Sequence, residues 1–134
     1  MKHWLVKSEP FKYSFADLQR DGETFWDGVR NYAARIHLNS MKVGDKVMFY
    51  HSNEGLAVMG IAKVTKAAFP DPTSNDPQWV AVNIAPVKAF KRPVALAEIK
   101  AHPALQNIAL VRIGRLSVMP LMKEEFEIIE ALGK

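Results

Sequence analysis

Short runs of apolar residues, separated by polar or proline-containing stretches, follow one another along this chain. Residues 3–7 form the first run and end at a Ser-Glu-Pro sequence, which predicts a strand. Residues 46–51 carry apolar side chains at odd and even positions alike and predict a strand buried on both faces. The polar residues 52–55 predict a hairpin turn into a further strand over residues 56–65. The pattern therefore predicts a core that begins with several short strands.

The strand pattern continues with interruptions. Gly60 stands inside a predicted strand and indicates a bulge or the close approach of another backbone segment. Residues 69–77 contain three prolines and predict an exposed loop, after which residues 79–87 predict a third core strand. Residues 116–118 predict a short strand that Pro120 ends.

The helices of this chain are predicted to be short. Ser14 is placed to cap a helix through Leu18, and Asn31 to cap one through Leu38. Residues 94–101 predict a helix that a His-Pro sequence stops. A terminal helix carries four apolar residues on one face: Met122, Phe126, Ile129 and Leu132. Because strands and helices do not alternate regularly, we expect an α+β fold, a compact and mostly β barrel with helices packed around it, rather than a doubly wound one.

The composition is typical of one soluble globular domain. The 134 residues fit a single compact domain, and about half of them are hydrophobic. The absence of cysteine excludes disulfides and thiolate metal sites. No apolar run approaches the roughly 20 residues that cross a bilayer, and no secretory signal is recognisable. We therefore expect a soluble, cytoplasmic protein.

The charge balance favours an acidic partner. The formal charge is +4, which makes nucleic acid more plausible as a partner than it would be for an acidic protein. The 18 lysine and arginine residues are spread along the chain and form no polybasic tail. This distribution does not favour a purely electrostatic, non-specific binder.

Trp26 is the first candidate for chemistry. It lies in a predicted turn, residues 25–28, followed by polar and turn-forming residues. A flat ring on such a loop suits stacking on a nucleobase, which is worth about 1–3 kcal/mol per base. Packing in the core explains an isolated tryptophan equally well, so both interpretations stay open.

Basic and hydroxyl side chains accompany the predicted strand ends and a predicted short helix: Lys7, Ser8, Arg30, Arg35, Arg115 and Ser117. Lysine and arginine suit phosphate contacts, and a serine hydroxyl suits the edge of a base. Arg115 and Ser117 would share one face of a strand. Solvated surface positions or surface ion pairs explain all of these residues as well, and are the more frequent situation.

A hydrolytic enzyme is the least favoured alternative. His51 as a base, with Asp27 and Glu9 as orienting carboxylates, would fit such chemistry. However, the chain has no nucleophile elbow, zinc-protease motif or phosphate-cradling glycine loop. The four histidines stand at unrelated positions, so we expect no metal site.

Six segments in order resemble the EVE domain: Lys7-Ser8-Glu9-Pro10, residues 26–32 (Trp-Asp-Gly-Val-Arg-Asn-Tyr), Met41-Lys42-Val43-Gly44-Asp45, Phe49-Tyr50-His51-Ser52, Asp76-Pro77-x-Trp79 and Arg115-Leu116-Ser117-Val118-x-Pro120. Each segment alone is a weak signal, but their order and spacing together are specific. The likeness covers essentially the whole chain, so residues 1–134 are expected to form one EVE domain.

The resemblance implies a PUA-like fold, a small distorted β-barrel flanked by short helices. It also implies a non-enzymatic module that binds nucleic acid, either DNA or RNA. EVE domains are related to the YTH domain, which holds a methylated adenine in an aromatic cage. The expected ligand is one base, modified for example by methylation, with no cofactor. The residues expected to form the base pocket are Ser8, Trp26, Asn31, Tyr32, His51, Ser52 and Ser117. Those expected to hold phosphates are Lys7, Arg30, Arg35 and Arg115.

Two positions depart from the pattern of the family. Ala33 stands where a glutamine is usual, and Gly114 stands where a serine is usual. Both departures remove hydrogen-bonding side chains near the expected pocket, which would alter ligand preference rather than fold. A sensor of a nucleoside or other small molecule, or a protein-interaction module on the same fold, is the alternative function.

Overall fold

The computed structural model describes all residues, 1–134, and is built around one mixed sheet of six strands. The strands are β1 (His3–Ser8), β2 (Thr24–Trp26), β3 (Lys46–His51), β4 (Ala57–Pro70), β5 (Val80–Ala95) and β6 (Val118–Leu121). Their order is β2-β5-β4-β3-β1-β6, in which β1 and β3 are parallel and all other neighbours antiparallel. The order has two ends, so the sheet is not closed by hydrogen bonds into a continuous barrel.

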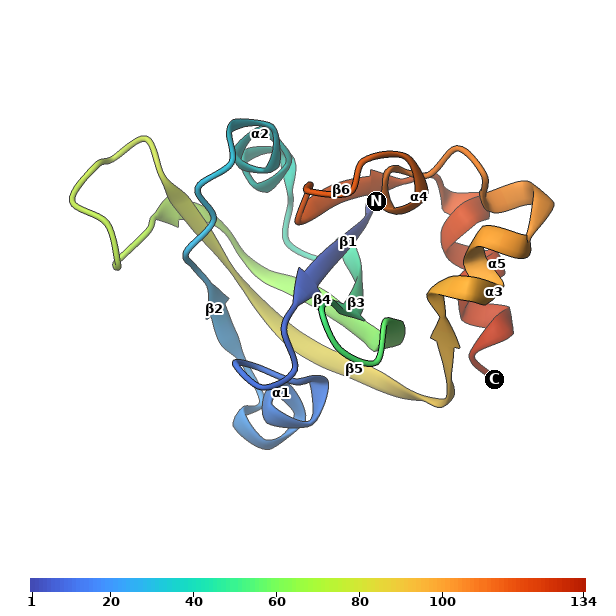
Figure 1. Cartoon of the computed structure of the whole chain (residues 1–134). Helices are drawn as coiled ribbons and strands as arrows, with labels where there is room; N and C mark the ends of the chain where they lie inside the picture. Colours follow the sequence, from blue (N-terminus) through green and yellow to red (C-terminus); the bar gives the residue numbers. More distant parts are fainter.

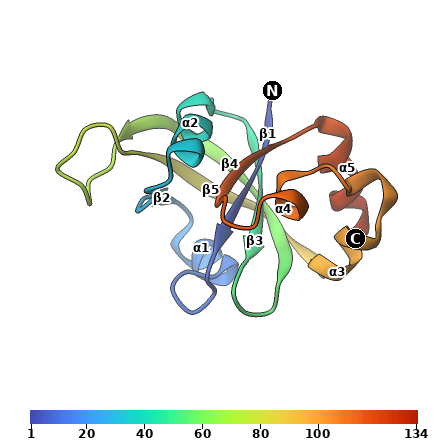
Figure 2. The same ribbon diagram turned by 45° about the horizontal axis from the view of Figure 1, so that its top comes forward.

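Five short α-helices and one 3₁₀ turn surround this sheet. They are α1 (Phe15–Asp21), α2 (Tyr32–Ser40), α3 (Leu96–Ala101), η1 (Pro103–Leu105), α4 (Ala109–Arg112) and α5 (Lys123–Leu132). Figure 1 shows α3 and α5 with the C-terminus at the right of the view, and α1 at the bottom, below β2. In both views the β4–β5 loop projects on the side away from α3 and α5 (Figure 2). None of the helices is long and apolar enough to span a membrane.

Two predicted helix caps are confirmed. The Ser14 hydroxyl accepts a hydrogen bond from the Asp17 N–H (3.0 Å), and the Asp17 carboxylate accepts one from the Ser14 N–H (2.9 Å), which is a complete capping box. The Asn31 side chain accepts from the Ala34 N–H (2.9 Å) at the start of α2. Local sequence therefore determines where both helices begin.

Strand β3 runs through the centre of the core, as its unbroken apolar sequence predicts. Residues 47–51 are all buried, and Phe49 has no exposed surface. The neighbouring strand bulges between Val58 and Gly60. A Cβ on Gly60 would lie 2.5 Å from the Lys88 carbonyl oxygen and 2.6 Å from the Phe15 ring. The predicted bulge and close approach at Gly60 are thus both confirmed.

The boundaries of β4 and β5 differ from those predicted. The predicted loop over residues 69–77 is wrong at its start, because Phe69 and Pro70 pair with Ala81 and Val80 and extend β4. The loop comprises residues 71–79, and Trp79 precedes the strand it was expected to start. At its other end β5 continues to Ala95, so α3 begins later than predicted. The long antiparallel pairing of β4 with β5 thus extends through Pro70, although proline locally favours a loop.

Four further predictions are corrected. Trp26 belongs to strand β2 and not to a turn, because residues 24–26 pair with β5. Pro120 lies inside β6, an edge strand where a missing N–H costs no ladder hydrogen bond. Arg115 and Ser117 therefore precede the strand and do not share one of its faces. Met122 is exposed at the cap of α5 rather than on its buried face.

Candidate nucleic-acid interface

A cavity of about 500 Å³ opens beside the end of β1, between the turn that leads to α1 and the segment that follows β2. This volume is within the range of small-molecule sites. Its lining residues are Lys7, Ser8, Glu9, Lys12, Tyr13, Thr24, Phe25, Trp26, Asp27, Gly28, Val29, Arg30 and Ser117. The lining combines aromatic rings with hydroxyl, basic and acidic side chains, which suits a planar polar ligand.

The Trp26 indole both packs on the core and lines the cavity. Its side chain is 9% exposed. The ring meets Phe49 edge-on, with centroids 5.4 Å apart, and Tyr13 in a similar arrangement at 6.5 Å. The two interpretations of Trp26 that the sequence left open, packing in the core and stacking on a base, are therefore compatible. Because both neighbours are aromatic, they hold the indole in one orientation beside the cavity.

Hydrogen bonds fix the polar part of the lining. The Ser8 hydroxyl donates to the Tyr13 carbonyl oxygen (2.5 Å), and the Lys7 N–H donates to the Ser117 carbonyl oxygen (2.9 Å). The Lys7 ammonium donates to the Gly114 carbonyl oxygen (3.2 Å), and burial lowers the pKa of Lys7. The Ser117 hydroxyl has no partner within the chain, so it is free to bond to a ligand in the cavity.

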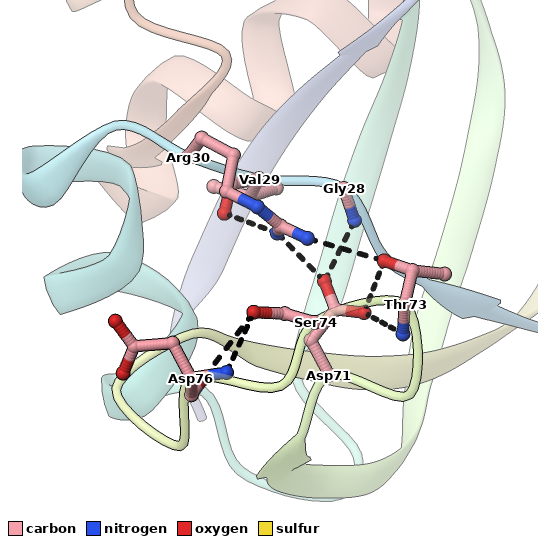
Figure 3. A network of polar contacts seen from close by, with 7 residues as sticks. All are labelled: Gly28, Val29, Arg30, Asp71, Thr73, Ser74 and Asp76. Carbon is pink, nitrogen blue, oxygen red and sulfur yellow. Dashed lines mark hydrogen bonds and ion pairs between the residues drawn. The ribbon is translucent and has the colours of Figure 1, made fainter.

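Asp71 ties the wall of the cavity to the β4–β5 loop (Figure 3). Its carboxylate has no exposed surface and accepts from the Gly28 N–H (2.8 Å) and from Arg30 Nη1 (2.9 Å). The Thr73 N–H (2.7 Å) and hydroxyl (2.6 Å) donate to its other oxygen. Burial would raise the pKa of Asp71, but the hydrogen bonds from Thr73, Arg30 and Gly28 outweigh it and lower the pKa to about 2.

This network engages Arg30 at the edge of the cavity. Arg30 Nη1 bonds to Asp71 and to the Val29 carbonyl oxygen (3.1 Å), and Nη2 lies 3.2 Å from the Thr73 hydroxyl. The ion pair with Asp71 offsets much of the positive charge of the Arg30 guanidinium. The phosphate contact expected of Arg30 stays a prediction, while its bracing of residues 28–30 follows directly from these distances.

A second aromatic group, the Tyr32–Trp79 cluster, lies outside the cavity. Tyr32 is 60% exposed, and its ring centroid is 5.2 Å from that of Trp79. The Arg35 guanidinium lies 5.2 Å from the Tyr32 ring and 5.8 Å from the Trp79 ring. Arg30 lies 5.7 Å from the Trp79 ring. Tyr32 and Arg35 thus belong to one partly exposed cationic and aromatic cluster, which adjoins the cavity through Arg30.

Besides Tyr32 and Arg35, four more of the predicted site residues lie apart from the cavity lining. The His51 imidazole is buried and its Nε2 accepts from the Phe15 N–H (3.1 Å). Burial lowers the pKa of His51, although Asp17 opposes the shift. The Asn31 side chain caps α2, the Ser52 N–H donates to the Ser8 carbonyl oxygen (2.9 Å), and Arg115 is exposed in the turn before β6. No group of three or more histidine, aspartate or glutamate residues gathers closely enough to hold a metal ion.

Comparison with known proteins decides the family. The family model described as the EVE domain matches residues 2–132. The chain belongs to the EVE domain family. Human thymocyte nuclear protein 1 is 38% identical over 164 aligned positions, which cover 97% of this chain and 73% of that protein.

Solved structures of other EVE domains superpose closely on this one. A protein from Agrobacterium tumefaciens has 44% sequence identity and a TM-score of 0.97, over 99% of this chain and 93% of the other. The human THYN1 protein, solved in complex with DNA containing 5-methylcytosine, has 38% identity and a TM-score of 0.92, over 100% and 98% of the two chains. The α+β, PUA-like fold predicted from the sequence is confirmed.

This EVE domain brings together only part of the predicted set. Of the residues predicted to form the base pocket, Ser8, Trp26 and Ser117 line the cavity, and of the predicted phosphate contacts, Lys7 and Arg30 do so. Phe25, which the sequence offers as a second ring for the pocket wall, also lines the cavity, while the sequence indicated no role at the site for Lys12, Tyr13, Asp71 and Trp79. The Glu-Pro turn that follows β1 is the one local signal that would have indicated Lys12 and Tyr13.

The two departures from the family pattern have different surroundings. Ala33 is exposed on α2 and does not line the cavity. Gly114 lies next to the cavity, because the Gly114 carbonyl oxygen accepts a hydrogen bond from the ammonium of Lys7, a lining residue. No heavy atom lies within 4 Å of the place of a Cβ at Gly114, so a larger side chain would fit there. Gly114 is therefore the departure that bears on the cavity.

Proposed function

We propose that this EVE domain binds DNA and holds one base, modified for example as 5-methylcytosine, in the cavity beside Trp26. The observation that carries this proposal is an aromatic-walled cavity of about 500 Å³ whose indole is held edge-on by two other rings. The related human THYN1 protein was solved with 5-methylcytosine-containing DNA, which supports the proposal. The cavity accepts a base that is unpaired or extruded from the stack.

Each part of the lining has a distinct role in this proposal. The Trp26 indole stacks on the base, and the free Ser117 hydroxyl and nearby backbone groups bond to its edge. Lys7 and Lys12 line the cavity, and in this proposal they hold the phosphates that flank the base. Arg30, fixed by Asp71, braces the wall. In this proposal the cavity binds without catalysis; His51, the base of the alternative hydrolytic mechanism, does not line it and is engaged by the Phe15 N–H.

The preference for a modified base is expected to be modest. One methyl group that enters an apolar pocket gains about 1 kcal/mol, which is close to a factor of five in affinity. A larger preference would require the methyl group to fill a tight space beside the rings. DNA is the polymer we propose, and RNA binding and a cytoplasmic location stay predictions from the sequence.

The test measures binding by fluorescence anisotropy, with a short labelled DNA that carries one 5-methylcytosine and with its unmodified counterpart. Trp26→Ala should weaken binding of the modified DNA about tenfold or more, because it removes the stacking contact. Phe90→Ala is the matched control, since Phe90 is a buried aromatic that packs on Gly133, away from the cavity. Both variants lose stability, but unchanged binding by a folded Trp26→Ala protein would refute the proposal.

The alternative function is a sensor of free nucleosides. Glu9 and Asp27 line the cavity together with the lysines, so its charge is mixed rather than uniformly positive. A neutral nucleoside would tolerate this mixture better than a polyanion does. Calorimetry with 5-methyldeoxycytidine distinguishes the two functions, because a sensor should bind the nucleoside as tightly as the DNA.

A further inference from the structure

The turn that borders the cavity is unusually well fixed. In the sequence Glu9-Pro10-Phe11-Lys12, the Lys12 N–H donates to the Glu9 carbonyl oxygen (3.0 Å) and the Tyr13 N–H donates to the same atom (3.0 Å). Pro10 stands second in the turn, where its ring fixes the backbone angle that the turn needs. Glu9 and Lys12, the first and last residues of the turn, line the cavity, whereas Pro10 and Phe11 at its tip stand outside the lining.

Side-chain contacts anchor the turn to the cavity wall. The Ser8 hydroxyl bonds to the Tyr13 carbonyl oxygen, and the Tyr13 hydroxyl bonds to the Asp21 carboxylate (2.9 Å). The Tyr13 ring meets the Trp26 indole edge-on. The turn and the proposed stacking surface are therefore parts of one rigid assembly.

This rigid turn presents a large apolar ring to solvent. Phe11 is 66% exposed and has no aromatic partner in the protein. Next to it, the Lys12 side chain is largely exposed and forms a 3.5 Å ion pair with Glu9. Isolated exposed apolar residues are ordinary on protein surfaces. A ring that a proline-stiffened turn holds between two cavity-lining residues, beside the largely exposed Lys12 ammonium, matches the chemistry of a stacked base and its phosphate.

We propose that Phe11 is a wedge that enters the base stack of duplex DNA at the place vacated by the base in the cavity. This inference rests on the proposed function. Extruding a base from a duplex leaves an unstacked gap, and an apolar side chain that fills the gap recovers part of the lost stacking. Lys12, which follows Phe11, pairs with the adjacent phosphate. The partner is accordingly a duplex that contains the modified base, and not only a single strand.

The experiment compares two labelled DNAs with the same 5-methylcytosine, one single-stranded and one duplex, by fluorescence anisotropy. Phe11→Ala should weaken duplex binding about tenfold and leave single-strand binding unchanged, because only the duplex has a gap to fill. Phe11→Leu, which keeps an apolar wedge, should recover most of the duplex affinity. Val43→Ala is the control, since Val43 is 65% exposed in the turn before β3 and is not in the cavity lining. Thermal melting checks that each variant is folded.

The outcomes separate the wedge from the proposed function. An equal loss on both DNAs, or no loss on the duplex, would overturn the wedge while leaving base binding in the cavity intact. Wild-type protein that binds neither DNA would overturn the proposed function and the wedge with it. A selective loss on the duplex, reversed by leucine, supports the wedge.

Discussion

At the scale of single residues, the Asp71 carboxylate is fully buried and charged, and it receives hydrogen bonds from Gly28, Arg30 and Thr73. Asp71→Asn would keep the shape of the side chain but replace one acceptor oxygen by a donor that faces other donors. We expect the free energy of unfolding at neutral pH to fall by about 2 kcal/mol or more. Urea denaturation measures this, and Thr73→Val, which removes only one of the donors, should cost less.

Asp71 also makes a prediction about pH. Its pKa in the folded protein is about 2, below the ordinary value of 3.8, so the unfolded chain binds the proton more tightly. The stability that Asp71 contributes is therefore present above about pH 4 and is lost as the pH falls toward 2. The difference in unfolding free energy between wild type and Asp71→Asn should shrink by about 2 kcal/mol over this range. A constant difference would contradict the assignment.

The residue scale also shows what the sequence could not indicate. The caps at Ser14 and Asn31 were predictable because their partners lie three residues away. The contact between Asp71 and Gly28 joins residues 43 positions apart, and an Asp-Pro pair in a proline-rich stretch indicates only a loop. The sequence left the role of Trp26 open for a similar reason. The rings that the indole contacts, Phe49 and Tyr13, belong to other segments of the chain, and local sequence does not indicate that they meet it.

At the scale of elements, Gly60 determines how β4 packs against β5 and α1. Gly60→Ala would place a Cβ 2.5 Å from the Lys88 carbonyl oxygen and 2.6 Å from the Phe15 ring. We expect a loss of about 2 kcal/mol of stability, because backbone cannot move aside as a flexible side chain can. Gly114→Ala is the control, since nothing lies within 4 Å of its Cβ position. Equal melting temperatures for the two variants would contradict this packing.

The presence of the helices and strands was easier to predict than the residues at which they begin and end. The buried strand β3 and both capped helices follow from local pattern, since apolar periodicity and capping residues act within a few positions. The lengths of β4 and β5 depend on pairing between them, which carries Pro70 into a strand. Pro120 is tolerated because β6 is an edge, a property that only the full sheet order defines.

At the scale of the whole molecule, the net charge of +4 and the lysines around the cavity predict salt-sensitive DNA binding. If Lys7, Lys12 and Arg115 each neutralise one phosphate, the logarithm of affinity should fall against the logarithm of salt concentration with a slope of about −3 for duplex DNA. Lys7→Gln should reduce the magnitude of this slope by about one. Lys91→Gln, on β5 and outside the cavity, should leave it unchanged. Affinity independent of salt would favour the nucleoside sensor instead.

The Asp71 carboxylate, which accepts hydrogen bonds from both Gly28 and Thr73, has a consequence for how the cavity would select a ligand. Because both segments bond to one buried group, residues 28–30 of the cavity wall are fixed to the β4–β5 loop by contacts within the protein itself. For the base binding that we propose, this means that little ordering of the wall would accompany binding, so little affinity would be lost to entropy. Selection among bases would then depend on the shape of a preformed wall.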